Sequence, residues 1–182
     1  MSLSRRRFLT RSASLAAAGG VLAAGSDAAS GGEDVDEISP ETSYTVHPIG
    51  RVENKKGQPP RIVLFERYAD GLLGMDGWSH VNVFWWFHKN DVPQKRAILQ
   101  VNPRGNKKNP LTGVFATRSP VRPNLIALTV CKIVSVEKNV MTLEKIDAFD
   151  GTPVLDLKPL IPPDTRHEGL RVPGWAGGGP KK

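Results

Sequence analysis

Short apolar segments separated by turn residues occupy residues 44–160 of this 182-residue chain, and they restrict its fold more than any other feature. The segments expected to be extended are 44–52, 61–66, 80–87, 97–101, 113–116, 126–136, 140–146 and 152–157. No long amphipathic helix is visible, and residues 67–75 form at most a short helix interrupted by the glycines at 71, 74 and 77. Closely spaced extended segments of this kind predict a mainly β domain, either a barrel or a sandwich.

The segment 81–87 is apolar at every position after Asn82. A strand with one face in water alternates apolar and polar residues, so this strand is expected to be covered on both faces. We interpret Trp85 and Trp86 as filling the core and a loop pocket. The alternative is that one of them stacks on a ligand.

The chain contains a single cysteine, Cys131, which excludes an internal disulfide. This residue lies in an apolar run with no histidine or lysine placed to activate it. We therefore expect a small core residue and not a nucleophile.

The histidines are scattered singly, at positions 47, 80, 88 and 167, and no metal-binding spacing joins them. The sequence also lacks the glycine fingerprints of nucleotide-binding loops and the Gly-x-Ser-x-Gly elbow of serine hydrolases. It therefore predicts no metal site, and it identifies no catalytic residue.

Residues 4–10 read Ser-Arg-Arg-Arg-Phe-Leu-Thr, and an apolar run rich in Ala and Gly follows over 13–25. A paired arginine before a short apolar run predicts a twin-arginine export signal over residues 1–29, and the run is too short for a stable membrane span. The alternative is a basic tail on a cytoplasmic protein. If the signal is used, the twin-arginine translocase is a transient partner and the protein is periplasmic or extracellular.

The remaining chain divides by composition. Residues 30–43 are acidic and carry Gly, Ser and Pro, which predicts a flexible linker. Residues 161–182 are rich in Pro and Gly and are expected to be disordered. Residues 44–160 between them have the size of one domain with one core.

The chain has 25 Lys and Arg against 18 Asp and Glu, a net charge of +7. Residues 1–29 contain four of the arginines and one aspartate, which leaves 21 basic and 17 acidic residues, a charge of about +4. This excess is compatible with an anionic ligand or a nucleic acid, but solubility alone also explains it.

Two dense motifs remain, Gly-Val-Phe-Ala-Thr-Arg-Ser-Pro-Val-Arg-Pro-Asn at 113–124 and Asp-Ala-Phe-Asp-Gly-Thr-Pro-Val-Leu-Asp-Leu-Lys-Pro at 147–159. The first places Arg118 and Arg122 in a loop stiffened by Pro120 and Pro123. If that loop lines a cavity, the guanidinium groups favour a carboxylate or phosphate ligand. The alternative is a rigid surface turn whose arginines pair with the aspartates at 147, 150 or 156. The second motif predicts a tight turn over 150–153.

In this order, the motifs resemble the TsaA-like family of tRNA methyltransferases, also called TrmO. The resemblance covers nearly the whole domain, from His-Pro-Ile-Gly at 47–50 through Tyr-Ala-Asp-Gly-Leu at 68–72, Gly-Trp-Ser-His at 77–80 and Trp-Phe-His at 86–88 to the two motifs above. It implies a small β-barrel of about seven strands with short helical insertions, and a homodimer. The implied activity is S-adenosylmethionine-dependent methylation of the N6-threonylcarbamoyladenosine beside the tRNA anticodon.

The resemblance also implies site residues. The positions that match cofactor-binding residues of the family are His88, Lys89, Arg118, Leu128, Ala148, Phe149, Asp150 and Gly151. Arg118 is expected to hold the cofactor carboxylate or the substrate anion, Asp150 the amine or ribose, and backbone groups near Phe149 the adenine edge. For the substrate we expect Arg104, Arg122 and Asn124. Arg104 belongs to a basic loop over 104–108 that can meet phosphate, and the alternative is a solvated hairpin tip.

The chain departs from the family pattern in two places. Where relatives have a cofactor-contacting Pro-Arg-Gln segment, residues 54–61 read Asn-Lys-Lys-Gly-Gln-Pro-Pro-Arg, a shortened segment with no clean counterpart, in which at best Pro60 and Arg61 substitute. Residues 123–127 read Pro-Asn-Leu-Ile-Ala in place of Pro-Asn-Pro-Ile-Gly. Neither cofactor nor tRNA is expected outside the cytoplasm. The alternative function is therefore an exported, non-catalytic binding module for an anionic or nucleoside-like ligand.

Overall fold

The computed structural model describes residues 39, 42–162, 169 and 171–176. The expected signal peptide, most of the linker and much of the C-terminal tail lie outside these residues. Contacts divide the chain into residues 1–43 and 44–182, and all strands and helices of the described residues belong to the second unit. The following description concerns that unit.

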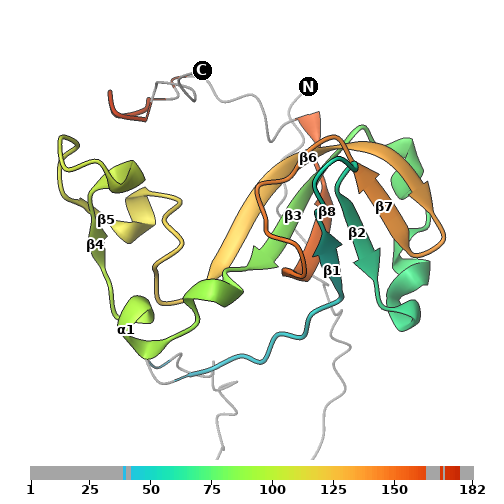
Figure 1. Cartoon of the computed structure of the whole chain (residues 1–182), viewed down its shortest axis with the longest axis horizontal. Coiled ribbons are helices and arrows are strands. Elements are labelled where there is room, and N and C mark those ends of the chain that lie inside the picture. Colours follow the sequence, from blue (N-terminus) through green and yellow to red (C-terminus); the bar gives the residue numbers. More distant parts are fainter. Residues whose placement is uncertain (1–38, 40–41, 163–168, 170, 177–182) are drawn as a thin grey trace, which may run out of the picture. The chain divides into compact units, whose positions relative to one another are not determined.

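Six strands form a closed barrel (Figure 1), and every neighbouring pair is antiparallel. Around the barrel the order is β1-β2-β7-β6-β3-β8, and β8 closes the sheet because it pairs with both β3 and β1. The strands are β1 (Gly50–Glu53), β2 (Arg61–Leu64), β3 (His80–Trp86), β6 (Ile126–Glu137), β7 (Val140–Leu143) and β8 (Pro153–Pro159). The predicted β-barrel is therefore present, with six strands in place of about seven.

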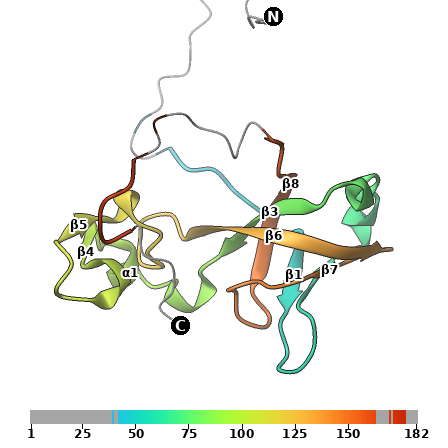
Figure 2. The same ribbon diagram turned by 90° about the horizontal axis from the view of Figure 1, so that it is seen from above.

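The chain between β3 and β6 forms an insertion beside the barrel (Figures 1 and 2). It holds a two-stranded sheet of β4 (Gln100–Val101) and β5 (Thr112–Gly113), the short helix α1 (Pro93–Arg96), and the 3-10 turns η3 (His88–Asn90), η4 (Pro103–Gly105) and η5 (Val114–Ala116). Because β4 and β5 pair with each other, they add nothing to the barrel.

Three local expectations need correction or confirmation. The first strand begins at Gly50 and not at residue 44, and the segment expected at 113–116 is mostly the turn η5. The short helix expected near 67–75 is confirmed as the 3-10 helix η1 (Glu66–Leu72), and η2 (Met75–Gly77) follows it. Among the described residues, no helix has the length and apolar character needed to cross a membrane.

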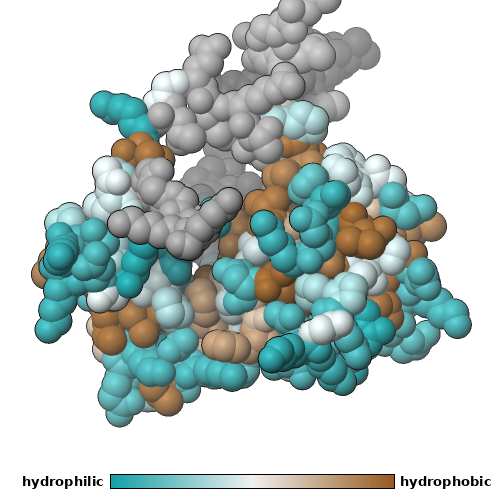
Figure 3. Space-filling model, turned by 45° about the horizontal axis from the view of Figure 1, so that its top comes forward, coloured by the Kyte–Doolittle hydropathy of each residue, from teal (hydrophilic) through white to brown (hydrophobic). Residues whose placement is uncertain are grey.

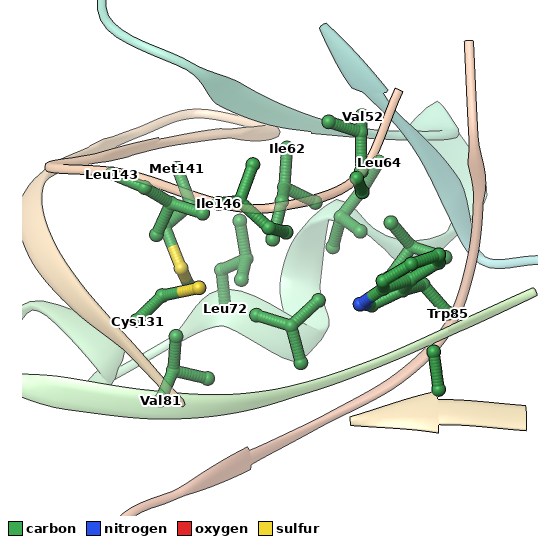
Figure 4. Packing of buried hydrophobic residues seen from close by; sticks show 14 residues of the cluster. Val52, Ile62, Leu64, Leu72, Val81, Trp85, Cys131, Met141, Leu143 and Ile146 are labelled. Atoms are coloured by element: carbon green, nitrogen blue, oxygen red, sulfur yellow. The ribbon is translucent and has the colours of Figure 1, made fainter. Parts of the chain in front are cut away.

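Strand β3 shows how the barrel encloses its core. Val81, Val83 and Trp85 are buried, whereas the alternate residues, Asn82, Phe84 and Trp86, are only partly covered. Burial therefore alternates along β3 although its sequence is apolar throughout. The strand was expected to be covered on both faces, but only its inner face is fully covered. The inner side chains belong to one cluster with Val52, Ile62, Leu64, Leu72, Cys131, Met141, Leu143, Ile146 and Val154 (Figure 4).

Cys131 is a core residue, as predicted. It is 1% exposed, and its Sγ lies 3.9 Å from the Thr129 carbonyl oxygen. Burial, assisted by the negative charge of Asp147, raises the pKa of the Cys131 thiol to about 12. The reactive thiolate is therefore absent at neutral pH.

Candidate functional site

A cavity of about 850 Å³ lies where the insertion meets the barrel. Its walls come from the end of β3 with η3, from α1, from the loop before β6, from the first half of β6, and from the segment between β7 and β8. The lining residues are Trp85, Phe87, His88, Lys89, Asn90, Lys95, Arg118, Pro120, Arg122, Ile126, Ala127, Leu128, Thr129, Val130, Asp147 and Phe149. The cavity has the size typical of small-molecule sites, which span about 300–1,000 Å³.

The structure brings together a large part of the predicted cofactor set. His88, Lys89, Arg118, Leu128 and Phe149 all line this cavity. Arg122, predicted for the substrate, lines it as well. Leu128 is 37% exposed and Phe149 59% exposed, so both offer apolar surface to a ligand. Further exposed apolar residues appear as brown patches among hydrophilic ones on the face shown in Figure 3.

The other predicted cofactor residues, Ala148, Asp150 and Gly151, form a turn and do not line the cavity. The backbone N–H of Asn54 donates to Asp150 Oδ1 at 2.8 Å, and Asn54 Nδ2 donates to the carbonyl oxygen of buried Ala148 at 2.8 Å. Gly151 has φ +75°, in the left-handed region that glycine adopts without strain. These two hydrogen bonds anchor the turn to Asn54, the residue that follows β1.

Arg104 lies elsewhere, in a second cavity of about 1230 Å³ next to the small sheet. Lys107, Phe115 and Trp175 also line this second cavity. Arg118 and Pro120 line both cavities, so the two spaces are separated by one loop. Asn124 is exposed and lines neither.

Pro60 and Arg61 also lie outside both linings. Arg61 donates instead to Glu53 Oε2 at 2.7 Å, and Arg51 donates to Oε1 at 2.9 Å. Partial burial alone would raise the pKa of Glu53, but the two arginine hydrogen bonds hold it below its ordinary value. In this structure Arg61 thus joins β2 to β1 through Glu53.

The arginines of the 113–124 motif do not pair with aspartates, which removes the surface-turn interpretation. Within the described part of the chain, neither Arg118 nor Arg122 forms an ion pair. The three candidate partners are engaged elsewhere: Asp147 with Thr129, Asp150 with Asn54, and Asp156 with Lys158. The cavity therefore presents two guanidinium groups to an anionic ligand.

Contacts around Asp91 fix the insertion against β3. Trp86 Nε1 donates to Asp91 Oδ2 at 2.9 Å, and Arg96 Nε donates to Asp91 Oδ1 at 2.8 Å. These bonds, that from Arg96 first, hold the pKa of Asp91 below its ordinary value. Arg96 also donates to the Pro123 carbonyl oxygen at 3.3 Å, which ties α1 to the arginine loop.

Two lysines complete the positive lining. The ammonium nitrogen of Lys89 lies 3.8 Å from the centroid of the Phe149 ring, in a cation–π contact. Lys95 Nζ donates to Asn90 Oδ1 at 2.9 Å and so joins α1 to η3. One face of the Phe149 ring is therefore occupied by a cation of the protein.

The sequence did not single out a polar chain in the cavity wall. Trp85 Nε1 donates to Thr129 Oγ1 at 3.1 Å, and Thr129 Oγ1 donates to Asp147 Oδ1 at 2.5 Å. In the sequence, Thr129 is a polar residue within an apolar segment. Asp147 was considered only as a possible ion-pair partner of Arg118 or Arg122. Among the described residues, no group of three or more His, Cys, Asp or Glu side chains is placed to hold a metal ion.

Comparison with known proteins identifies the fold. The family model of the tRNA-methyltransferase O N-terminal domain matches residues 47–164. A probable S-adenosyl-L-methionine-binding protein of Methanocaldococcus jannaschii is 44% identical over 115 residues, which cover 63% of this chain and 90% of that protein. The tRNA (adenine(37)-N6)-methyltransferase of Rattus norvegicus is 42% identical over 120 residues, 61% of this chain but 27% of that protein.

Solved structures agree with these relatives. A crystal structure of TrmO matches with a TM-score of 0.58 and 30% identity, over 74% of this chain and 65% of that one. TrmO from Pseudomonas aeruginosa matches with a TM-score of 0.54 and 28% identity, over 71% and 62%. The match thus spans less than two thirds of each TrmO chain. Because the family model matches residues 47–164, which include the whole barrel and the cavity, the chain belongs to the tRNA-methyltransferase O N-terminal domain family.

Proposed function

We propose that the chain is an S-adenosylmethionine-dependent methyltransferase that holds its cofactor in the 850 Å³ cavity. The observation that carries the proposal is the convergence of His88, Lys89, Arg118, Leu128 and Phe149 on that cavity in a chain of this family. Relatives named as S-adenosylmethionine-binding proteins and tRNA methyltransferases support it, and they favour it over a non-catalytic module.

The cavity wall fits the chemistry of this cofactor. When bound, the cofactor supplies an electrophilic methyl group on its sulfonium. Arg118 and Arg122, which have no ion-pair partner among the described residues, bind its carboxylate. The apolar side chains of Ile126, Leu128 and Phe149 cover its nucleoside part and keep water out. Methyl transfer then requires chiefly that the acceptor atom be held in line at contact distance.

For the acceptor we propose an adenine of tRNA, as the name of the rat relative states for that protein. The second cavity supports this proposal because Arg104, Lys107 and Arg118 line it and can meet phosphate groups. Since Arg118 and Pro120 border both cavities, an RNA segment in the second cavity lies beside a cofactor in the first.

We further propose a homodimer. The outer face of β6 exposes Leu128, Val130 and Val134, which are 37%, 42% and 60% exposed. A second copy packed on this strand would cover Val134 and close over the side of the cavity that Leu128 and Val130 line. Sedimentation velocity should give a particle of twice the 19.8 kDa monomer mass, and a particle of monomer mass at micromolar concentration would contradict the dimer.

Export remains a proposal from the N-terminal motif, which lies outside the described residues. A reporter fused behind the chain should be exported by the twin-arginine route. Replacing Arg5 and Arg6 by lysine should keep the fusion inside the cell. Export that persists in the double variant, or that never occurs in the original chain, would contradict the proposal.

The function is tested first by calorimetric titration of S-adenosylmethionine into the purified full-length chain. We expect binding at micromolar affinity, followed by transfer of a radiolabelled methyl group to bulk tRNA. Absence of binding at millimolar cofactor would overturn the proposed function. Binding without transfer to any tRNA would retain the cofactor site and overturn the acceptor.

A further inference from the structure

The polar chain in the cavity wall gives Asp147 a defined orientation. The indole nitrogen of Trp85 can only donate a hydrogen bond, and an ionised carboxylate can only accept one. The Thr129 hydroxyl, which lies between them, must therefore accept from Trp85 at 3.1 Å and give its one proton to Asp147 Oδ1 at 2.5 Å. The direction of both hydrogen bonds is fixed by chemistry.

Of the three hydrogen-bonded residues, Trp85 is buried in the core, whereas Asp147 lies in the cavity. Trp85 is 5% exposed and packs edge to face on Phe87, with the ring centroids 4.7 Å apart. Asp147 is exposed and lines the cavity. Within the described residues, its second oxygen, Oδ2, accepts no hydrogen bond. The carboxylate is thus held by one oxygen and available through the other.

The charges around Asp147 indicate what this oxygen binds. Among the described residues that line the cavity, Lys89, Lys95, Arg118 and Arg122 contribute four positive charges, and Asp147 contributes the single negative one. A purely anionic ligand would be repelled by Asp147. A ligand that carries a carboxylate and a nearby ammonium, as an amino acid does, satisfies both signs.

We propose that Asp147 is the ammonium subsite of the cavity: its Oδ2 accepts a hydrogen bond from the α-ammonium of an amino-acid group whose carboxylate lies on the arginines. The inference rests on the proposed function, in which that group is the methionine part of the cofactor. An ammonium suits this position better than the sulfonium does, because it has N–H donors and the sulfonium has none. Trp85 and Thr129 are positioning residues.

The experiment measures the affinity of the full-length chain for three probes before and after Asp147→Asn. S-adenosylmethionine carries ammonium and sulfonium, S-adenosylhomocysteine carries the ammonium only, and methylthioadenosine lacks the amino-acid group. We expect the substitution to weaken binding of the first two by about tenfold or more, and of methylthioadenosine by less than about twofold. This difference between probes would not result from a general loss of structure.

Other results for the three probes would lead to different conclusions. A loss confined to S-adenosylmethionine would place Asp147 at the sulfonium, and an equal loss for all three probes would place it at the adenosine or in the scaffold. Either result, or no loss at all, overturns the ammonium subsite and leaves the proposed function standing. Failure of the original chain to bind any probe would overturn the proposed function itself.

Two further variants control for charge and folding. Glu144→Gln removes one negative charge from a residue that pairs with Lys132 at 3.2 Å and does not line the cavity, so all three affinities should stay unchanged. Thr129→Val keeps the Asp147 charge and removes the bond that orients it. We expect a smaller loss, about threefold, with the same preference among probes. If Asp147→Asn does not fold, the absence of any such preference in Thr129→Val would itself contradict the proposal.

Discussion

Replacement of Gly50 by alanine tests how tightly the barrel closes. Gly50 is buried in β1, where it pairs with Leu64 of β2 and Val154 of β8. An added Cβ would collide with the Val63 carbonyl oxygen and lie 2.7 Å from Leu64 Cα. Both are backbone atoms, so no rotation of a side chain can relieve the contact.

The geometry sets the size of the effect. Ordinary contact needs about 3.5 Å between carbons, so β1 and β2 must separate by nearly 1 Å. That shift would stretch the bond from the Phe65 N–H to the Ile49 carbonyl oxygen, now 2.9 Å, out of hydrogen-bond range. Overpacking costs about 1–3 kcal/mol and a lost hydrogen bond about 1 kcal/mol, so the free energy of unfolding should fall by about 2–4 kcal/mol. For a domain of this size the melting temperature should fall by roughly 8–16 °C.

Thermal and urea unfolding, followed by circular dichroism, measure this loss. Gly77→Ala is the matched control, because an added Cβ at Gly77 meets no atom within 4 Å. We expect the control to be neutral or stabilised by up to about 1 kcal/mol through the entropy of the unfolded chain. If Gly50→Ala melts within about 2 °C of the original chain, the close approach of the two strands has been misjudged.

Three further results are expected. Arg118→Ala should weaken S-adenosylmethionine binding in calorimetry by at least about tenfold, which is about 1.4 kcal/mol. Arg67→Ala, outside the cavity, should leave the affinity unchanged. If the Arg118→Ala variant binds as tightly as the original chain, Arg118 is not part of the site. Because its pKa is about 12, the Cys131 thiol should resist a disulfide reagent at pH 8 until the chain is unfolded, and rapid labelling of the native protein would contradict its burial. Because the pKa of Asp91 is held below its ordinary 3.8, the bonds from Arg96 and Trp86 should persist in mild acid and be lost only as the pH falls through that lowered value. Tryptophan fluorescence should then show a transition that Asp91→Asn lacks, and identical acid titrations of the two proteins would refute this anchor.

The sequence predicted the local features of the barrel well. Strand positions follow from short apolar runs and turn residues, which act over neighbouring positions, so β2, β3, β6 and β8 lie within two residues of the expected segments, while β7 ends three residues early. The core position of Cys131 follows in the same way from the apolar run around it. Local sequence patterns did not predict the number of strands in the barrel, because they do not show which strands pair. In the structure β4 and β5 pair with each other and not with the barrel.

The site was predictable only in part. Family motifs selected Arg118, Leu128 and Phe149, and the cavity contains all three. They equally selected Asp150, which the structure uses to bind the backbone of Asn54, 96 residues away in sequence. A motif records which residue types occur together, and it does not separate those that face a ligand from those that hold the loop.

By itself, the sequence determined the β character of the domain, its core strands and its family, because these depend on patterns that persist along the chain. Tertiary structure alone decided that hydrogen bonds link Trp85, Thr129 and Asp147. It also decided that Arg118 and Arg122 line a cavity without an ion-pair partner among the described residues. The physical reason is that hydrogen bonds and ion pairs depend on distances of about 3 Å between side chains. Only closure of the barrel brings residues from β3, β6 and the segment before β8 to such distances.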